Sequence, residues 1–126
     1  MPTNTNKHNK SRSLSKLDIS QITEYLYVAA SPNAEFAGVI SNLNVRLVIN
    51  MKFIQPAKVY QEPPFRMLTL RTFDLIFIPI PILKLEKGVE TALPAIRNGE
   101  SVLIYCRKGR HRSVAMASTI LIAKGY

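Results

Sequence analysis

The chain has few of the residues that build metal sites or disulfides. Its 126 residues include one cysteine, Cys106, and two histidines. A single cysteine cannot form an internal disulfide, and one cysteine with two distant histidines is too small a set for a structural zinc site. We therefore expect neither metal nor cofactor. The N-terminus also lacks the apolar core of a secretory signal, so the expected location is a reducing cytoplasm.

Long hydrophobic runs are missing as well. The longest apolar stretch, LIFIPIPIL at residues 75–83, is broken by two prolines. A membrane-spanning helix needs about 20 consecutive apolar residues, so we expect no transmembrane segment. Hydrophobic residues nevertheless make up 47% of the chain, which suits a globular core. The length allows at most one domain of modest size.

Acidic residues are missing from both ends of the chain. The net charge is +9, and the whole excess lies in residues 1–16, with four basic residues, and residues 101–126, with five. The first segment is polar, so we expect a disordered basic tail followed by one domain at residues 17–126. Weak attraction of this tail to nucleic acid or anionic membrane is a less favoured interpretation. The second cluster surrounds Cys106 and needs a local explanation.

Hydrophobic periodicity predicts that strands and helices alternate along the chain. This alternation indicates an α/β fold with a central, mostly parallel sheet flanked by helices. We expect Ser31 to be the N-cap of the first helix, with Pro32 in its first position, and Pro94 to kink or break the second helix. The predicted strands are two within 19–30, then 45–50, 66–70 and 101–105, and the predicted helices are 31–44, 83–97 and 113–124.

The last predicted helix, residues 113–124, is apolar on nearly all sides. Such a helix is normally covered all round by other elements. The sequence ends directly after it, so we expect a covering element to be missing. That element is either the remainder of an incomplete domain or a second copy of the chain in a dimer.

Cys106 follows a buried strand and precedes a tight loop and a helix. Backbone amides at a helix N-terminus converge on an anion, and the helix dipole favours negative charge there. A thiol in this setting is stabilised as the thiolate, which is a strong nucleophile. Phosphate is the anion that matches best, because Arg112 can bind two of its oxygens. The residues therefore predict a phosphate-binding loop that holds an ionised cysteine.

Cys106, Gly109, Arg112 and Ser113 form the pattern C-x-x-G-x-x-R-S behind a hydrophobic strand. This pattern resembles the signature of the cysteine-based protein phosphatases. Two further segments, ITEYLYVAASPNAEF and LNVRLVINM, are similar to the entry segment and the next strand of the dual-specificity branch. The resemblance covers about residues 19–126 and implies a dual-specificity phosphatase-like fold. That fold continues into further helices, so we expect its last helices to be absent from this sequence.

The resemblance implies a phosphate-monoester hydrolase that works through a phosphocysteine intermediate. Cys106 would be the nucleophile, Arg112 would bind the phosphoryl group with the loop amides, and Ser113 would help the thiolate leave. The family's general acid is an aspartate on a mobile loop before the cysteine. Asp74 precedes Cys106 by 32 positions and is the only aspartate between residues 19 and 126, so we expect it in this role. Glu86 is a weaker substitute.

The basic side chains of the loop also indicate which substrates are expected. The loop is similar to those of phosphatases that act on inositol pyrophosphates and phosphoinositides, because several cations suit a substrate with several phosphates. Phosphorylated proteins are the favoured substrates, with polyphosphorylated inositols or phosphoinositides as the alternative. RNA 5′-phosphates are less favoured, because no interleaving of aromatic and basic residues supports a specific nucleic-acid site. The loop positions expected to contact phosphate besides Arg112 are Arg107, Lys108, Gly109, Arg110 and His111.

One position departs from the family pattern. Tyr105 stands where the family usually has a histidine that orders the loop and tunes the thiol, although a tyrosine could still donate a hydrogen bond. A catalytically inactive phosphate-binding module is therefore an open alternative. A rhodanese-type sulfurtransferase also places a cysteine loop between a strand and a helix. The Arg112-Ser113 ending and the matching Asp74 argue against that class.

Overall fold

The structure is a computed structural model that describes residues 18–54, 56–72, 79–107 and 111–125. The basic tail predicted at residues 1–16 lies outside these residues. None of the helices in the described ranges is long and apolar enough to cross a membrane. In chain order the elements are β1 (Ile19–Thr23), β2 (Leu26–Ala30), the 3-10 helix η1 (Ala34–Phe36), α2 (Ala37–Asn42), β3 (Val45–Asn50), the 3-10 helix η2 (Lys58–Gln61), β4 (Arg66–Thr69), α3 (Ile82–Arg97), β5 (Ser101–Cys106) and α4 (His111–Lys124).

A five-stranded sheet in the order β1-β2-β5-β3-β4 forms the centre of the fold. β5 lies between β2 and β3 and pairs parallel with both, and β4 pairs parallel with β3. β1 is antiparallel to β2. Every residue of β5 is buried, because the strand lies in the middle of a sheet that is covered on both faces. The predicted α/β fold with a mostly parallel sheet is confirmed.

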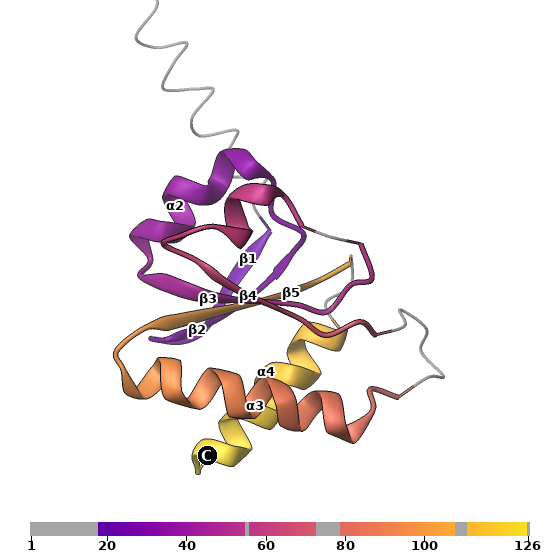
Figure 1. Cartoon of the computed structure of the whole chain (residues 1–126). Helices are drawn as coiled ribbons and strands as arrows, with labels where there is room; N and C mark the ends of the chain where they lie inside the picture. The colour runs from indigo at the N-terminus through magenta and orange to yellow at the C-terminus, as the bar shows by residue number, and fades with distance from the viewer. Residues whose placement is uncertain (1–17, 55, 73–78, 108–110, 126) are drawn as a thin grey trace, which may run out of the picture.

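Side chains of β5 alternate between the two faces of the sheet. Val102, Ile104 and Cys106 pack with residues of α3 and α4, whereas Leu103 and Tyr105 pack with residues of η1, α2 and η2. Figure 1 shows these two layers, with α2 above the sheet and α3 and α4 below it. The neighbours Tyr105 and Cys106 therefore face opposite layers.

The first helix begins later than the sequence predicts. Asn33, not Ser31, is the N-cap, and η1 precedes α2. The backbone at Asn33 is extended, and its carbonyl oxygen accepts hydrogen bonds from the Phe36 amide at 3.1 Å and from the Tyr60 hydroxyl at 2.6 Å. Since Tyr60 comes from η2, a tertiary contact accompanies the local bond at this start.

α3 runs from Ile82 to Arg97 as one helix with Pro94 inside it, so a break at Pro94 is wrong, and a kink there stays a prediction. Pro94 lies on the exposed side of the helix. A proline there removes one hydrogen bond, and the carbonyl that loses its partner can bind water instead.

α4 buries one side against the sheet and leaves another exposed. Met116, Ala117 and Ile120 are buried, whereas Val114 is 45% exposed and Ile122 is 72% exposed. Part of this predicted apolar surface is therefore exposed in the described part of the chain. A dimer through this face is not supported by these observations and stays a prediction. Gly125 ends the helix with φ of +106°, as expected.

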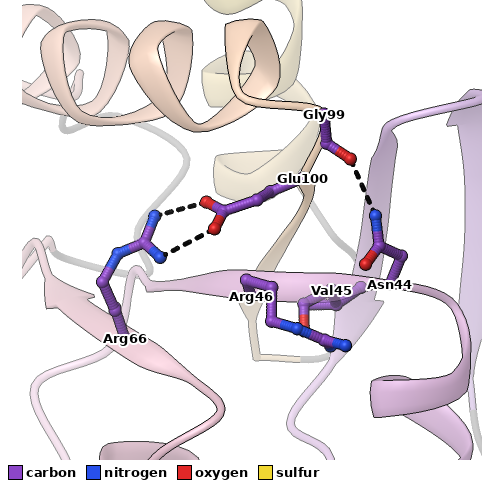
Figure 2. Close-up of polar contacts among 6 residues, drawn as sticks. All are labelled: Asn44, Val45, Arg46, Arg66, Gly99 and Glu100. Atoms are coloured by element: carbon purple, nitrogen blue, oxygen red, sulfur yellow. Dashed lines mark hydrogen bonds and ion pairs between the residues drawn. The ribbon is translucent and has the colours of Figure 1, made fainter.

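Polar contacts hold the edge of the sheet where the parallel strands begin (Figure 2). Arg66 of β4 donates two hydrogen bonds to the Glu100 carboxylate, at 2.6 and 3.1 Å, and these bonds lower the pKa of Glu100. Asn44 adopts a left-handed φ of 63° and donates from Nδ2 to the Gly99 carbonyl at 2.7 Å. These contacts tie together the starts of β3, β4 and β5.

Candidate active site

The carboxyl ends of β3, β4 and β5 meet at one edge of the sheet. Ligands of open α/β sheets bind at this kind of edge. The described residues that directly follow these strands, 51–54, 70–72 and 107, include Lys52, Arg71 and Arg107 and no acidic residue. This edge therefore carries positive charge, which suits an anionic ligand.

Cys106 is the last residue of β5 and is 1% exposed. Its Sγ lies 3.3 Å from Ser113 Oγ and 3.2 Å from the carbonyl oxygen of Arg107. Ser113 is fully buried near the start of α4. A hydroxyl at this distance can donate a hydrogen bond to a thiolate. The structure thus brings together two of the residues predicted to be catalytic.

Arg112 extends from α4 to the carboxyl ends of β3 and β4 and is 7% exposed. Its Nη1 donates hydrogen bonds to the carbonyl oxygens of Met51 at 2.8 Å and Thr72 at 2.6 Å, and lies 3.2 Å from Thr72 Oγ1. Such acceptors offset the cost of burying a charged group. Because the guanidinium is planar, holding one corner also restricts the plane in which its other nitrogens lie.

The other predicted site residues divide into two groups. Arg107 and His111 are described, and both are exposed beside the buried Cys106 and Arg112. Asp74 and the loop residues Lys108, Gly109 and Arg110 lie outside the described residues, so their roles stay predictions.

The residues that surround Arg112 were not predicted from the sequence. Thr72 is 2% exposed and is linked to Arg112 across 40 positions of sequence, and no local pattern indicates it. Asn50 is fully buried at the end of β3, where its Oδ1 accepts from the Lys52 amide at 2.9 Å and its Nδ2 donates to the Ile54 carbonyl at 3.1 Å. These two bonds shape the turn that presents the Met51 carbonyl. A polar residue closing the apolar strand VRLVIN was the available signal for Asn50.

Tyr105 packs on the face of the sheet opposite to Cys106. It is 2% exposed, and its buried hydroxyl has no hydrogen-bond partner within the described ranges. Burial, with a smaller effect from Tyr60, raises the pKa of Tyr105 well above its usual range. The hydrogen bond that a tyrosine could donate at this position is therefore not seen among the described residues.

This environment predicts that Tyr105→Phe leaves the free energy of unfolding unchanged or raises it by up to about 1 kcal/mol, because an unpartnered buried hydroxyl is destabilising. Tyr60→Phe is the matched comparison. The Tyr60 hydroxyl donates to the Asn33 carbonyl at 2.6 Å, so its removal should lower the free energy of unfolding by about 1 kcal/mol. Urea denaturation of both variants measures the difference. A free energy of unfolding that falls in Tyr105→Phe as much as in Tyr60→Phe would contradict this prediction and reveal a partner outside the described residues.

Sequence comparison finds a curated relative of part of the chain. No model of a known protein family matches the chain. A protein of Mus musculus named phosphatidylglycerophosphatase and protein-tyrosine phosphatase 1 is 34% identical over 86 residues. The match covers 63% of this chain and 44% of the mouse protein. The chain thus spans less than half the length of that relative.

Several solved structures share the fold. PTPMT1 in complex with PI(5)P has a TM-score of 0.73 and 27% identity, covering 85% of this chain and 73% of that chain. Human DUSP28 has a TM-score of 0.72 and 24% identity, covering 82% of this chain and 68% of that one. TpbA of P. aeruginosa has a TM-score of 0.69 and 20% identity, covering 89% and 68%. The last two likenesses concern the fold alone.

Proposed function

We propose that the chain is a member of the cysteine-based phosphatases, in their dual-specificity branch, and that it hydrolyses phosphate monoesters through a phosphocysteine intermediate. The observation that carries the proposal is the placement of Cys106. It ends the central parallel strand with its Sγ 3.3 Å from Ser113 Oγ, and the buried Arg112 stands beside that serine. The contact between the Cys106 thiol and the Ser113 hydroxyl, with a buried arginine as the residue before that serine, supports the proposed roles.

In the proposed reaction the Cys106 thiolate attacks phosphorus, and the bond from phosphorus to the ester oxygen breaks. Arg112 and the loop amides stabilise the charge on the phosphoryl oxygens in the transition state. Asp74 gives its proton to the leaving oxygen and then takes a proton from the water that attacks the phosphocysteine. Ser113 donates a hydrogen bond to the departing thiolate. The products are an alcohol and inorganic phosphate.

The experiment that tests this proposal is hydrolysis of p-nitrophenyl phosphate in the presence of EDTA. Because the chain has a single cysteine, alkylation with iodoacetate modifies one thiol only. We expect turnover that alkylation abolishes and that inorganic phosphate protects. Oxyanion binding without turnover would instead identify an inactive phosphate-binding module. Consumption of thiosulfate would identify a sulfurtransferase.

Asp74→Asn should affect esters unequally. For phenyl phosphate, whose leaving group needs a proton, we expect kcat to fall about 10²–10⁴-fold, the usual contribution of a positioned general acid. For p-nitrophenyl phosphate the loss should be much smaller, because nitrophenolate leaves without protonation. Steady-state kinetics with both esters measure the two losses of kcat, and their ratio tests the acid role. Glu86→Gln on α3 is the control and should leave both rates unchanged. Equal losses on the two esters would argue against an acid role for Asp74.

Phosphorylated proteins remain the first proposed substrate class, as expected from the sequence. Two observations support lipid phosphates as the alternative class. The name of the mouse relative joins a phosphatidylglycerophosphatase to a protein-tyrosine phosphatase, and the PTPMT1 structure is a complex with PI(5)P. Phosphate release from a phosphotyrosine peptide, compared with release from vesicles that contain phosphoinositides, ranks the two classes.

A further inference from the structure

Thr72 occupies a junction between three parts of the chain. It follows β4, and it stands two residues before Asp74 in the sequence. Its amide and its Oγ1 both donate to the Met51 carbonyl, at 3.2 and 2.6 Å. Its own carbonyl accepts from Arg112 Nη1 at 2.6 Å, and its Oγ1 lies 3.2 Å from the same nitrogen. Thr72 therefore joins the turn after β3 to the guanidinium of α4.

The orientation of Arg112 depends on these contacts. Its Nη1 is held between carbonyl oxygens that belong to two separate loops, one after β3 and one after β4. Hydrogen bonds to a charged group in a buried site are stronger than neutral ones. Two-point binding of a phosphoryl group requires the guanidinium to present a fixed edge. Anything that loosens Nη1 should therefore weaken the grip on phosphate.

We propose that Thr72 is a positioning residue for the phosphatase reaction. It holds Arg112 in the orientation that binds the phosphoryl group, and it does so at the start of the segment that carries Asp74. The proposal rests on the proposed function for the identity of the ligand. The contacts themselves are independent of any reaction.

The alternative is that Thr72 only satisfies a buried carbonyl, and substitutions separate the two roles. Thr72→Val keeps the branched shape and removes the hydroxyl. Thr72→Ser keeps the hydroxyl and removes a methyl group. Thr91→Val on α3 is the matched control, because among the described residues the Thr91 hydroxyl donates to the Lys87 carbonyl one turn back, at 2.8 Å, and not toward the site. A purely structural role would lower the melting temperature without a selective loss of oxyanion affinity.

The test measures tungstate affinity by calorimetry, together with kcat and KM for p-nitrophenyl phosphate and the melting temperature. We expect Thr72→Val to weaken tungstate binding and kcat/KM by about 10-fold, the scale of one hydrogen bond to a charged group. Thr72→Ser should restore most of this loss, and Thr91→Val should show none. Unchanged tungstate affinity in Thr72→Val would overturn the proposal.

A double-mutant cycle combines Thr72→Val with Arg112→Lys, with tungstate affinity measured by competition. If Thr72 acts through Arg112, Thr72→Val should weaken tungstate binding only slightly in the Arg112→Lys background. An equal loss in both backgrounds would show that Thr72 acts elsewhere. A wild type that binds tungstate without hydrolysing any ester would remove the proposed function, and the effect of Thr72 on binding would still decide this inference.

Discussion

Cys106→Ser should abolish hydrolysis of p-nitrophenyl phosphate while tungstate binding persists. Serine differs from cysteine by one atom and keeps the buried position at the end of β5, so the fold should be preserved. The hydroxyl is a far weaker nucleophile than a thiolate when no base activates it. We expect kcat to fall about 10⁴-fold or more, as is usual when the nucleophile of an enzyme is removed. Initial rates with EDTA present and calorimetry with tungstate measure the two quantities.

The single cysteine makes this comparison sharp, because no second thiol can replace Cys106. Ser113→Ala is the companion variant, since it removes the hydroxyl 3.3 Å from Sγ and keeps the nucleophile. In that variant the first step should survive and the second should slow, so a burst of nitrophenol should precede a low steady rate. Turnover by Cys106→Ser close to the wild-type rate would exclude the phosphocysteine mechanism.

The sheet could be predicted from the sequence because its central strands are buried on both faces. β3 and β5 are nearly continuous apolar runs, and their burial in the structure matches this pattern. The first helix was placed too early because Asn33, and not Ser31, is its N-cap, and the bond from the Tyr60 hydroxyl to the Asn33 carbonyl is a contact that no local pattern contains. The continuity of α3 at Pro94 likewise depends on that residue facing solvent.

The candidate site was predictable only where its residues are close in sequence. Cys106, Arg112 and Ser113 lie within one loop motif, and the structure places Cys106 against Ser113. The acceptors of Arg112 are backbone carbonyls 61 and 40 positions away. A carbonyl is present at every residue, so composition and spacing cannot indicate which one will bind an arginine. Packing of the ends of β3 and β4 beside α4 makes that choice.

Arg112→Lys should give the opposite pattern to Cys106→Ser, with the nucleophile kept and the oxyanion affinity lost. Lysine preserves the charge, and its ammonium can still donate to the Met51 or Thr72 carbonyl, so the fold should tolerate the change. It cannot form the planar two-point contact with a phosphoryl group. We expect kcat/KM for p-nitrophenyl phosphate to fall about 10²–10³-fold, as when a positioned donor to a developing anion is removed. Tungstate affinity should fall in parallel.

Arg107→Lys is the matched control for this variant. Arg107 carries the same kind of side chain directly after Cys106, but it is exposed, and the backbone amide at this loop position should bind phosphate whatever the side chain. The control should therefore keep nearly wild-type kinetics. Comparable losses in Arg107→Lys and Arg112→Lys would mean that the loop attracts phosphate through general positive charge. A selective loss in Arg112→Lys, with tungstate still bound by Cys106→Ser, would assign binding to the arginine and bond cleavage to the cysteine.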